Sequence, residues 1–187
     1  MLVISVILTF LIITVMITDI TRFIIPNKFV LVILLLYPVM VYIAPVKPDW
    51  QFALMVAAAA FIVGFILFAL KVMGGGDVKL LAVTSLYVNH TDFLDFIVGV
   101  AIFGGLLSII LIIIRPLIVY IFSRLGKSIE SVPRVLTVNA PLPYGLAIGT
   151  AFLVLLWSGE INGIDILGNA RDNMYLTSPH PDSYKPQ

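Results

Sequence analysis

The sequence has no cysteine and few charged residues. Without cysteine the chain has no disulfide bond, no thiolate metal site and no cysteine nucleophile, while its redox compartment stays open. Only 11% of the 187 residues are charged, whereas 61% are hydrophobic, and the mean hydropathy is +1.14. A soluble domain of this length needs far more polar surface. We therefore predict an all-α polytopic integral membrane protein whose apolar side chains face the lipid bilayer.

Histidine and net charge are also scarce. His90 and His180 lie far apart and in no metal-ligand spacing, so we predict no metal site and no cofactor. The net charge of +1 gives no electrostatic basis for a nucleic-acid partner. The sequence does not indicate an oligomeric state.

Apolar runs dominate what is present, and they predict six transmembrane helices in a membrane domain over residues 1–159. The fourth run has about half of the roughly 20 residues that a membrane span needs, so a re-entrant or interfacial segment is the alternative. No basic residue precedes the first run, which favours a retained helix over a cleaved signal peptide. Residues 160–187 are polar and predicted to be irregular. The predicted spans are about 1–18, 29–44, 52–70, 77–90, 93–114 and 142–157.

The basic residues favour a fourth run that crosses the membrane. If it crosses, the loops 19–28, 71–79 and 115–140 share one side and carry eight of the eleven Lys and Arg residues. Since basic loops stay in the cytoplasm, this predicts that both termini lie outside, with the three loops cytoplasmic at the inner (plasma) membrane. The eight residues are Arg22, Lys28, Lys71, Lys79, Arg115, Arg124, Lys127 and Arg134.

Two aspartates, Asp19 and Asp77, are predicted at the same membrane depth on the cytoplasmic side. A carboxylate at such a position is costly unless it is paired or faces water. Asp77 follows three glycines and could serve only as a helix N-cap. Asp19 ends the first span, where the helix dipole disfavours an anion, and it could pair with Arg22.

A pair of neighbouring carboxyl groups supports acid–base hydrolysis. Two such groups cannot both ionise comfortably, so one holds a proton while the other is charged. The charged group deprotonates a water, and the protonated group donates to the scissile carbonyl or the leaving amine. This chemistry needs no metal and no covalent nucleophile.

Three segments resemble signatures of the type IV prepilin peptidases, a family of membrane aspartic peptidases. Asp19 to Asn27, with Arg22, Pro26 and Asn27, resembles their D-x(n)-R-x-x-I-P-N segment. Gly74-Gly75-Gly76-Asp77-Val78-Lys79 resembles G-x-G-D-x-K. Residues 141–145 resemble the stretch of proline and glycine before the last helix. The resemblance covers roughly residues 1–157.

The resemblance implies that Asp19 and Asp77 are the catalytic pair, at the cytoplasmic ends of the first and fourth helices. It implies a pilin-like precursor as substrate, cut after the glycine that ends a short basic leader and precedes a hydrophobic segment. The site-shaping residues that it implies are Arg22, Pro26, Asn27, Gly74, Gly75, Gly76 and Lys79.

The chain is most similar to the short members of the family, which serve tight-adherence (Flp-type) pili. It lacks the cytoplasmic insertion with paired cysteines that is found in members that also methylate the new N-terminus, so we do not expect N-methyltransferase activity. The archaeal pre-archaellin peptidases share G-x-G-D and are an alternative. A small ion-coupled transporter subunit is another, although transporters more often place acidic residues near the middle of their spans.

Overall fold

The computed structural model describes residues 2–44, 47–88, 92–125, 134–137 and 140–158. In this part the chain forms six α-helices and a short 3₁₀ helix and no strand, which confirms the predicted all-α class. His90, His180 and the predicted polar tail at 160–187 lie outside the described residues. The helices are α1 (Leu2–Arg22), α2 (Asn27–Ile43), α3 (Trp50–Ala69), α4 (Gly75–Ser85), α5 (Phe93–Arg124), η2 (Arg134–Leu136) and α6 (Tyr144–Ser158).

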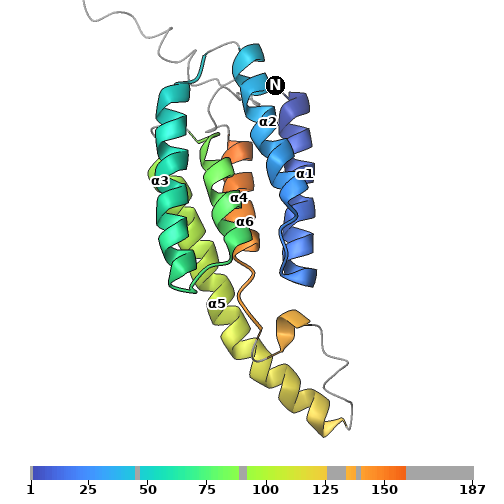
Figure 1. Cartoon of the computed structure of the whole chain (residues 1–187). Coiled ribbons are helices and arrows are strands. Elements are labelled where there is room, and N and C mark those ends of the chain that lie inside the picture. The colour runs from blue at the N-terminus through green and yellow to red at the C-terminus, as the bar shows by residue number, and fades with distance from the viewer. Residues whose placement is uncertain (1, 45–46, 89–91, 126–133, 138–139, 159–187) are drawn as a thin grey trace, which may run out of the picture.

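Consecutive helices alternate in direction, so the α1–α2 and α3–α4 connections lie at the same end of the bundle as the C-terminal end of α5 and the N-terminal end of α6 (Figure 1). The helices α1, α3 and α5 are long and apolar enough to cross a membrane, and α2 and α6 are shorter apolar helices. These features support a membrane protein. Two of the predicted basic loops, 19–28 and 71–79, therefore lie at the same end of the bundle.

The fourth apolar run forms a shorter helix than predicted. It was expected at 77–90, but α4 has only 11 residues, Gly75–Ser85. The helix packs against α2, α3 and α6, and most of its residues are buried. The hydroxyls of Thr84 and Ser85 donate hydrogen bonds to the backbone carbonyl oxygens one turn earlier, so these polar groups are satisfied inside the bundle. Because its neighbours enclose it, α4 does not need the length of a lipid-facing span.

The fifth helix is longer than predicted. It was expected to end at Ile114, with a polar loop from Arg115, but it continues through Pro116 to Arg124. The guanidinium of Arg115 is buried and donates to the carbonyl oxygens of Val135, Ala140 and Pro141 at 3.0, 2.8 and 2.9 Å. Arg115 therefore holds the chain that returns to α6, rather than marking the end of a span.

Glycines bring the central helices close to their neighbours. A Cβ at Gly64 of α3 would lie 3.0 Å from Val78 Cγ1 of α4. A Cβ at Gly149 of α6 would lie 2.6 Å from Met16 Cγ of α1. Small residues at such crossings are typical of helix packing in membranes, where close backbone contact replaces the hydrophobic driving force.

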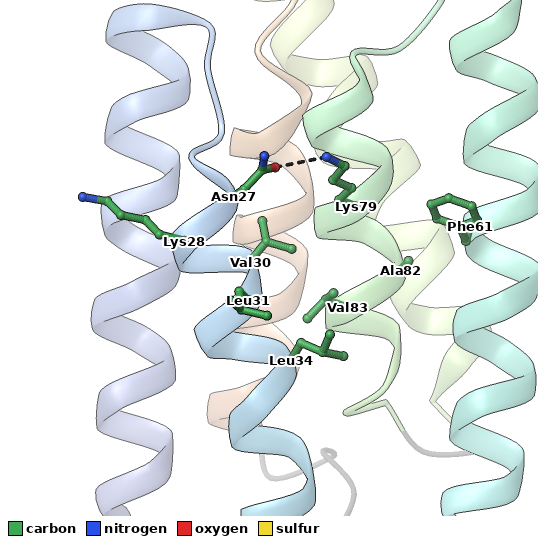
Figure 2. Close-up of a pocket in the computed structure, with 9 residues that line it drawn as sticks. All are labelled: Asn27, Lys28, Val30, Leu31, Leu34, Phe61, Lys79, Ala82 and Val83. Atoms are coloured by element: carbon green, nitrogen blue, oxygen red, sulfur yellow. Dashed lines mark hydrogen bonds between the residues drawn. The ribbon is translucent and has the colours of Figure 1, made fainter.

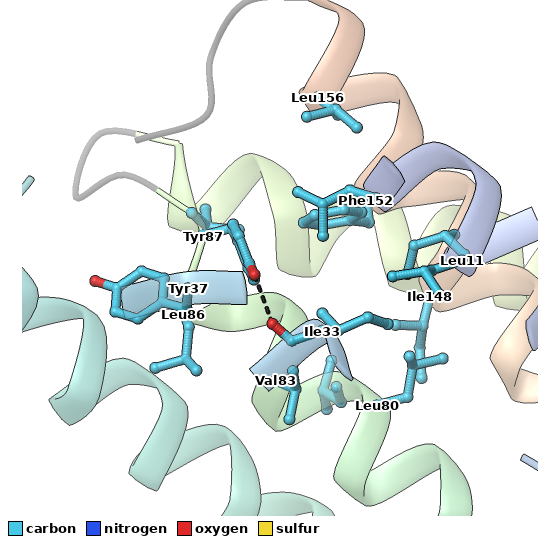
Figure 3. Packing of buried hydrophobic residues seen from close by; sticks show 14 of the residues in the cluster. Leu11, Ile33, Tyr37, Leu80, Val83, Leu86, Tyr87, Ile148, Phe152 and Leu156 are labelled. Atoms are coloured by element: carbon cyan, nitrogen blue, oxygen red, sulfur yellow. Dashed lines mark hydrogen bonds between the residues drawn. The ribbon is translucent and has the colours of Figure 1, made fainter. Parts of the chain in front are cut away.

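A buried aromatic cluster ties α2, α4 and α6 together at the end of α4. The Tyr87 hydroxyl donates to the carbonyl oxygen of Ile33 at 2.6 Å (Figure 3). The Tyr87 ring meets Tyr37 and Phe152 edge-on, with centroids 5.4 and 5.8 Å apart. This cluster fixes α4 relative to α2 and α6, and so fixes where the N-terminal residues of α4 lie along the axis of the bundle.

Candidate active site

Asp19 occupies the last turn of α1, and only 4% of its surface is exposed. The helix ends because Phe23 adopts a left-handed conformation, with φ of 53°, and its N–H donates to the Asp19 carbonyl oxygen at 2.9 Å. Such a residue is a common way to end a helix, although it is usually glycine. The turn redirects the chain toward Pro26 and leaves the Asp19 side chain inside the bundle.

Asp77 lies in the first turn of α4 and is 7% exposed. The interpretation of Asp77 as the N-cap is wrong, because Gly74 holds that position. The Gly74 N–H instead donates to Asp77 Oδ2 at 3.1 Å. This is the returning half of a capping box, since glycine has no side chain for the other half. One carboxylate oxygen therefore caps the helix, and Oδ1 stays free of that bond.

The two aspartates line one pocket of about 230 Å³. Asp19 Oδ2 and Asp77 Oδ1 are buried and make no hydrogen bond within the described residues, and the charge of Asp19 acts on Asp77. At about 30 Å³ per molecule, the pocket has room for several waters. The lining is completed by Phe23, Ile24, Ile25, Asn27, Gly74, Gly75, Gly76 and Lys79.

The N-terminus of α6 faces both aspartates. The backbone amides of Gly145 and Leu146 interact electrostatically with the carboxylate of Asp19, and the Gly145 amide also interacts with that of Asp77. The free amides and the dipole at a helix N-terminus favour an anion. They offset the unfavourable place of Asp19 at the C-terminal end of α1. Sequence reasoning noted Gly145 only as part of a family motif and gave it no role.

The other predicted site residues divide into two groups. Asn27, Lys79 and the three glycines line the pocket with the aspartates. Arg22 is exposed and outside this lining, so it does not pair with the buried Asp19 Oδ2. Pro26 is the N-cap residue of α2 and orients the chain that carries Asn27.

Glycine 76 is required by close approach rather than by an unusual backbone angle. A Cβ at this position would lie 3.0 Å from Ile25 Cβ. Any larger residue would push the α1–α2 connection away from α4, which separates the chain segments that carry the two aspartates.

Among the described residues, no three His, Asp or Glu side chains gather to hold a metal.

A family model described as the type IV leader peptidase family matches residues 6–110. The chain belongs to this family. The match spans α1 to the middle of α5 and includes both aspartates. No curated protein and no solved structure matches the chain.

Membership in the type IV leader peptidase family gives the pocket a chemical context. The family indicates peptidase activity on leader-bearing precursors of the pilin type, and the apolar helices place that activity in a membrane. The match does not include α6. Even so, the backbone amide of Gly145, in the first turn of α6, interacts electrostatically with both aspartates.

Arg115 is expected to support activity of the leader peptidase from outside the pocket. Its three bonds hold the chain immediately before α6, and so hold Gly145 against Asp19. Lysine keeps the charge but cannot span three carbonyl oxygens. Arg115→Lys should lower kcat/KM roughly 10- to 100-fold if Asp19 is a reacting group, because small displacements of such groups are costly.

The matched control is Arg124→Lys, near the end of the same helix, where the exposed guanidinium bonds Tyr120. Cleavage rates and limited proteolysis of the α5–α6 connection would be measured for both variants. Full activity of Arg115→Lys with an intact connection would show that these bonds do not set the site.

Proposed function

We propose that this protein is an aspartic endopeptidase that removes the leader from type IV pilin-like precursors, with Asp19 and Asp77 as its catalytic pair. The proposal rests on one observation: two buried carboxyl groups, carried by different helices, line the same small pocket in a chain of the leader peptidase family. Each has an oxygen that accepts no hydrogen bond from the described residues, and a water between them would satisfy both.

The geometry supports hydrolysis without a covalent intermediate. The charged aspartate takes a proton from water, and the water oxygen attacks the scissile carbonyl carbon. The protonated aspartate donates its proton to the carbonyl oxygen. The aspartate that took a proton from water then passes it to the amine as the C–N bond breaks, and a hydroxyl of the tetrahedral intermediate returns a proton to the other aspartate. The products are a new carboxylate on the leader and a new N-terminus on the pilin. Because the pair titrates as a unit, the base is not assigned to one aspartate.

The pocket residues have supporting roles in this proposal. Asn27 and Lys79 present donors to the substrate backbone, and Gly74, Gly75 and Gly76 let a peptide strand approach the aspartates closely. Pro26 fixes the direction of the chain before Asn27. Arg22 is exposed and outside the pocket lining, so we assign it no part in the reaction.

The site faces the cytoplasm in this proposal, because the basic connections gather at its end of the bundle. The substrate is a precursor of the tight-adherence type, cut after the glycine that ends its leader. A pre-archaellin precursor is the alternative substrate. The transporter alternative is disfavoured because both aspartates lie at helix ends rather than midway along a span.

Oriented membrane vesicles would test the reaction and the orientation together. A soluble precursor peptide with its leader is added to inside-out and to right-side-out vesicles that contain the protein. We expect cleavage only in inside-out vesicles, and product masses that place the cut directly after the glycine.

Cleavage only in right-side-out vesicles would reverse the orientation and leave the chemistry intact. No cleavage of tight-adherence precursors, together with cleavage of pre-archaellin, would assign the other substrate. Proton flux into proteoliposomes without cleavage of either precursor would favour the transporter reading.

A further inference from the structure

The helices α2 and α3 both pack on α4 and leave an apolar groove beside it. The groove has a volume of about 450 Å³ (Figure 2). It is lined by Asn27, Lys28, Val30, Leu31, Leu34, Phe61, Lys79, Ala82 and Val83. Apart from the three polar residues at one end, the lining is wholly aliphatic or aromatic.

The shape of this α2–α4 groove follows from residue size. The small side chain of Ala82 on α4 forms the floor of the groove, and Leu31 and Leu34 of α2 and Phe61 of α3 form its walls. These three side chains are 53%, 42% and 46% exposed, so the groove is open at the surface of the bundle. In a membrane, an apolar chain can therefore enter it sideways.

The groove adjoins the pocket that holds the two aspartates. Asn27 and Lys79 line both the groove and the pocket that holds Asp19 and Asp77. Lys79 Nζ donates to Asn27 Oδ1 at 3.1 Å, and Figure 2 shows this bond across one end of the groove. A polypeptide whose scissile bond reaches the aspartates can continue past this bond between the two spaces.

We propose that the α2–α4 groove binds the apolar segment of the precursor that follows the scissile bond. The inference rests on the proposed function, because it requires the scissile bond to lie at Asp19 and Asp77. The Asn27–Lys79 bond then opens, and the two side chains donate to backbone carbonyl oxygens of the extended residues next to the cut.

Binding of the leader in the site explains why the groove would take up the apolar segment of the precursor rather than lipid. Lipid tails are as apolar as the groove, so packing alone gives little preference for a peptide over lipid. Once the leader occupies the site, the following residues are held beside the groove at a high effective concentration. Modest packing against Leu31, Leu34 and Phe61 is then sufficient to position the scissile bond.

A filled groove should impair only substrates that carry the apolar segment. Ala82→Phe places a ring on the groove floor, whereas Ala59→Phe places it on the exposed face of α3, away from the groove. For the full precursor, Ala82→Phe should raise KM about tenfold or more, with kcat nearly unchanged. A truncated peptide that lacks the apolar segment should be cleaved equally by both variants and by wild type.

Cross-linking reports occupancy without the reaction, and the chain has no native cysteine to interfere. Leu31→Cys lies in the groove, and Val32→Cys, 41% exposed on the same helix, does not. Both are combined with Asp77→Asn, so that the precursor stays intact. A cysteine in the apolar segment of the precursor should form a disulfide with Leu31→Cys under oxidising conditions and not with Val32→Cys.

The outcomes separate the groove from the chemistry. Cross-linking at Leu31→Cys without cleavage by wild type would support the groove and contradict the proposed reaction. Normal cleavage by Ala82→Phe, with equal or no cross-linking at both cysteines, would overturn the proposal that the groove binds the precursor. Equal loss of both substrates with Ala82→Phe would assign its effect to the catalytic pocket and would also overturn it.

Discussion

Asparagine at position 19 or 77 is expected to lower the cleavage rate by roughly 100- to 10,000-fold, the range that acid–base groups contribute. Neither amide can take a proton from water or donate one as a carboxylic acid does. Each single variant should lose nearly as much as the double variant, because the two groups act as a unit. The measurement is cleavage of a precursor in membranes at equal expression.

The same substitutions should leave the fold intact. In wild type, the Gly74 N–H donates a hydrogen bond to Asp77 Oδ2, and in Asp77→Asn the amide oxygen can accept the same bond. A neutral amide is also easier to bury than a carboxylate, so thermal stability in detergent should stay constant or rise. Asp95→Asn, exposed in the first turn of α5, is the matched control and should cleave at the wild-type rate. Near-normal turnover by either active-site variant would remove that aspartate from the mechanism.

A methyl group at Gly145 is expected to have the second largest effect. Its Cβ would lie 2.7 Å from Asp19 Oδ2 and 2.9 Å from Ile25 Cδ1, so the carboxylate or α6 must move. A displacement of about 1 Å at a reacting group can cost about 100-fold in rate. Gly145→Ala should therefore lower kcat roughly 10- to 100-fold, with a smaller change in KM.

Two other glycines separate this effect from helix packing. No atom of the described residues lies within 4 Å of a Cβ at Gly105 of α5, so Gly105→Ala should cleave normally and gain slight stability. Gly149→Ala clashes with Met16, one helical turn from Asp19 and without contact to its carboxylate, and should lower the melting temperature more than the rate. Equal activity of Gly145→Ala and Gly105→Ala would mean that α6 does not position Asp19.

Sequence patterns predicted the helices better than their ends. Apolar runs identified all six, because lipid-facing and core-facing positions alike exclude charge. The end of α5 was missed because Arg115 resembles a residue at the water interface, whereas its guanidinium is buried on three carbonyl oxygens from the returning chain. Those partners are 20 to 26 residues away in sequence, and no local pattern reveals them.

The candidate site was predictable where charge and depth defined it. Asp19 and Asp77 stood out because carboxylates are costly beside apolar spans, and the structure brings both to one pocket. Gly145 could not be assigned a role in this way. It carries no functional group, and its contribution is a backbone amide and an absent side chain, which matter only once α6 lies beside α1.

The unequal lengths of the helices have a further consequence. α4 and α6 have 11 and 15 residues, whereas α1 and α3 have 21 and 20. In a bilayer thinner than the long helices, α1 and α3 would tilt, whereas the shorter α4 and α6 need not. Tilt of α1 would move Asp19 relative to Asp77 and Gly145, so we expect the proposed cleavage to be slower in bilayers of short acyl chains.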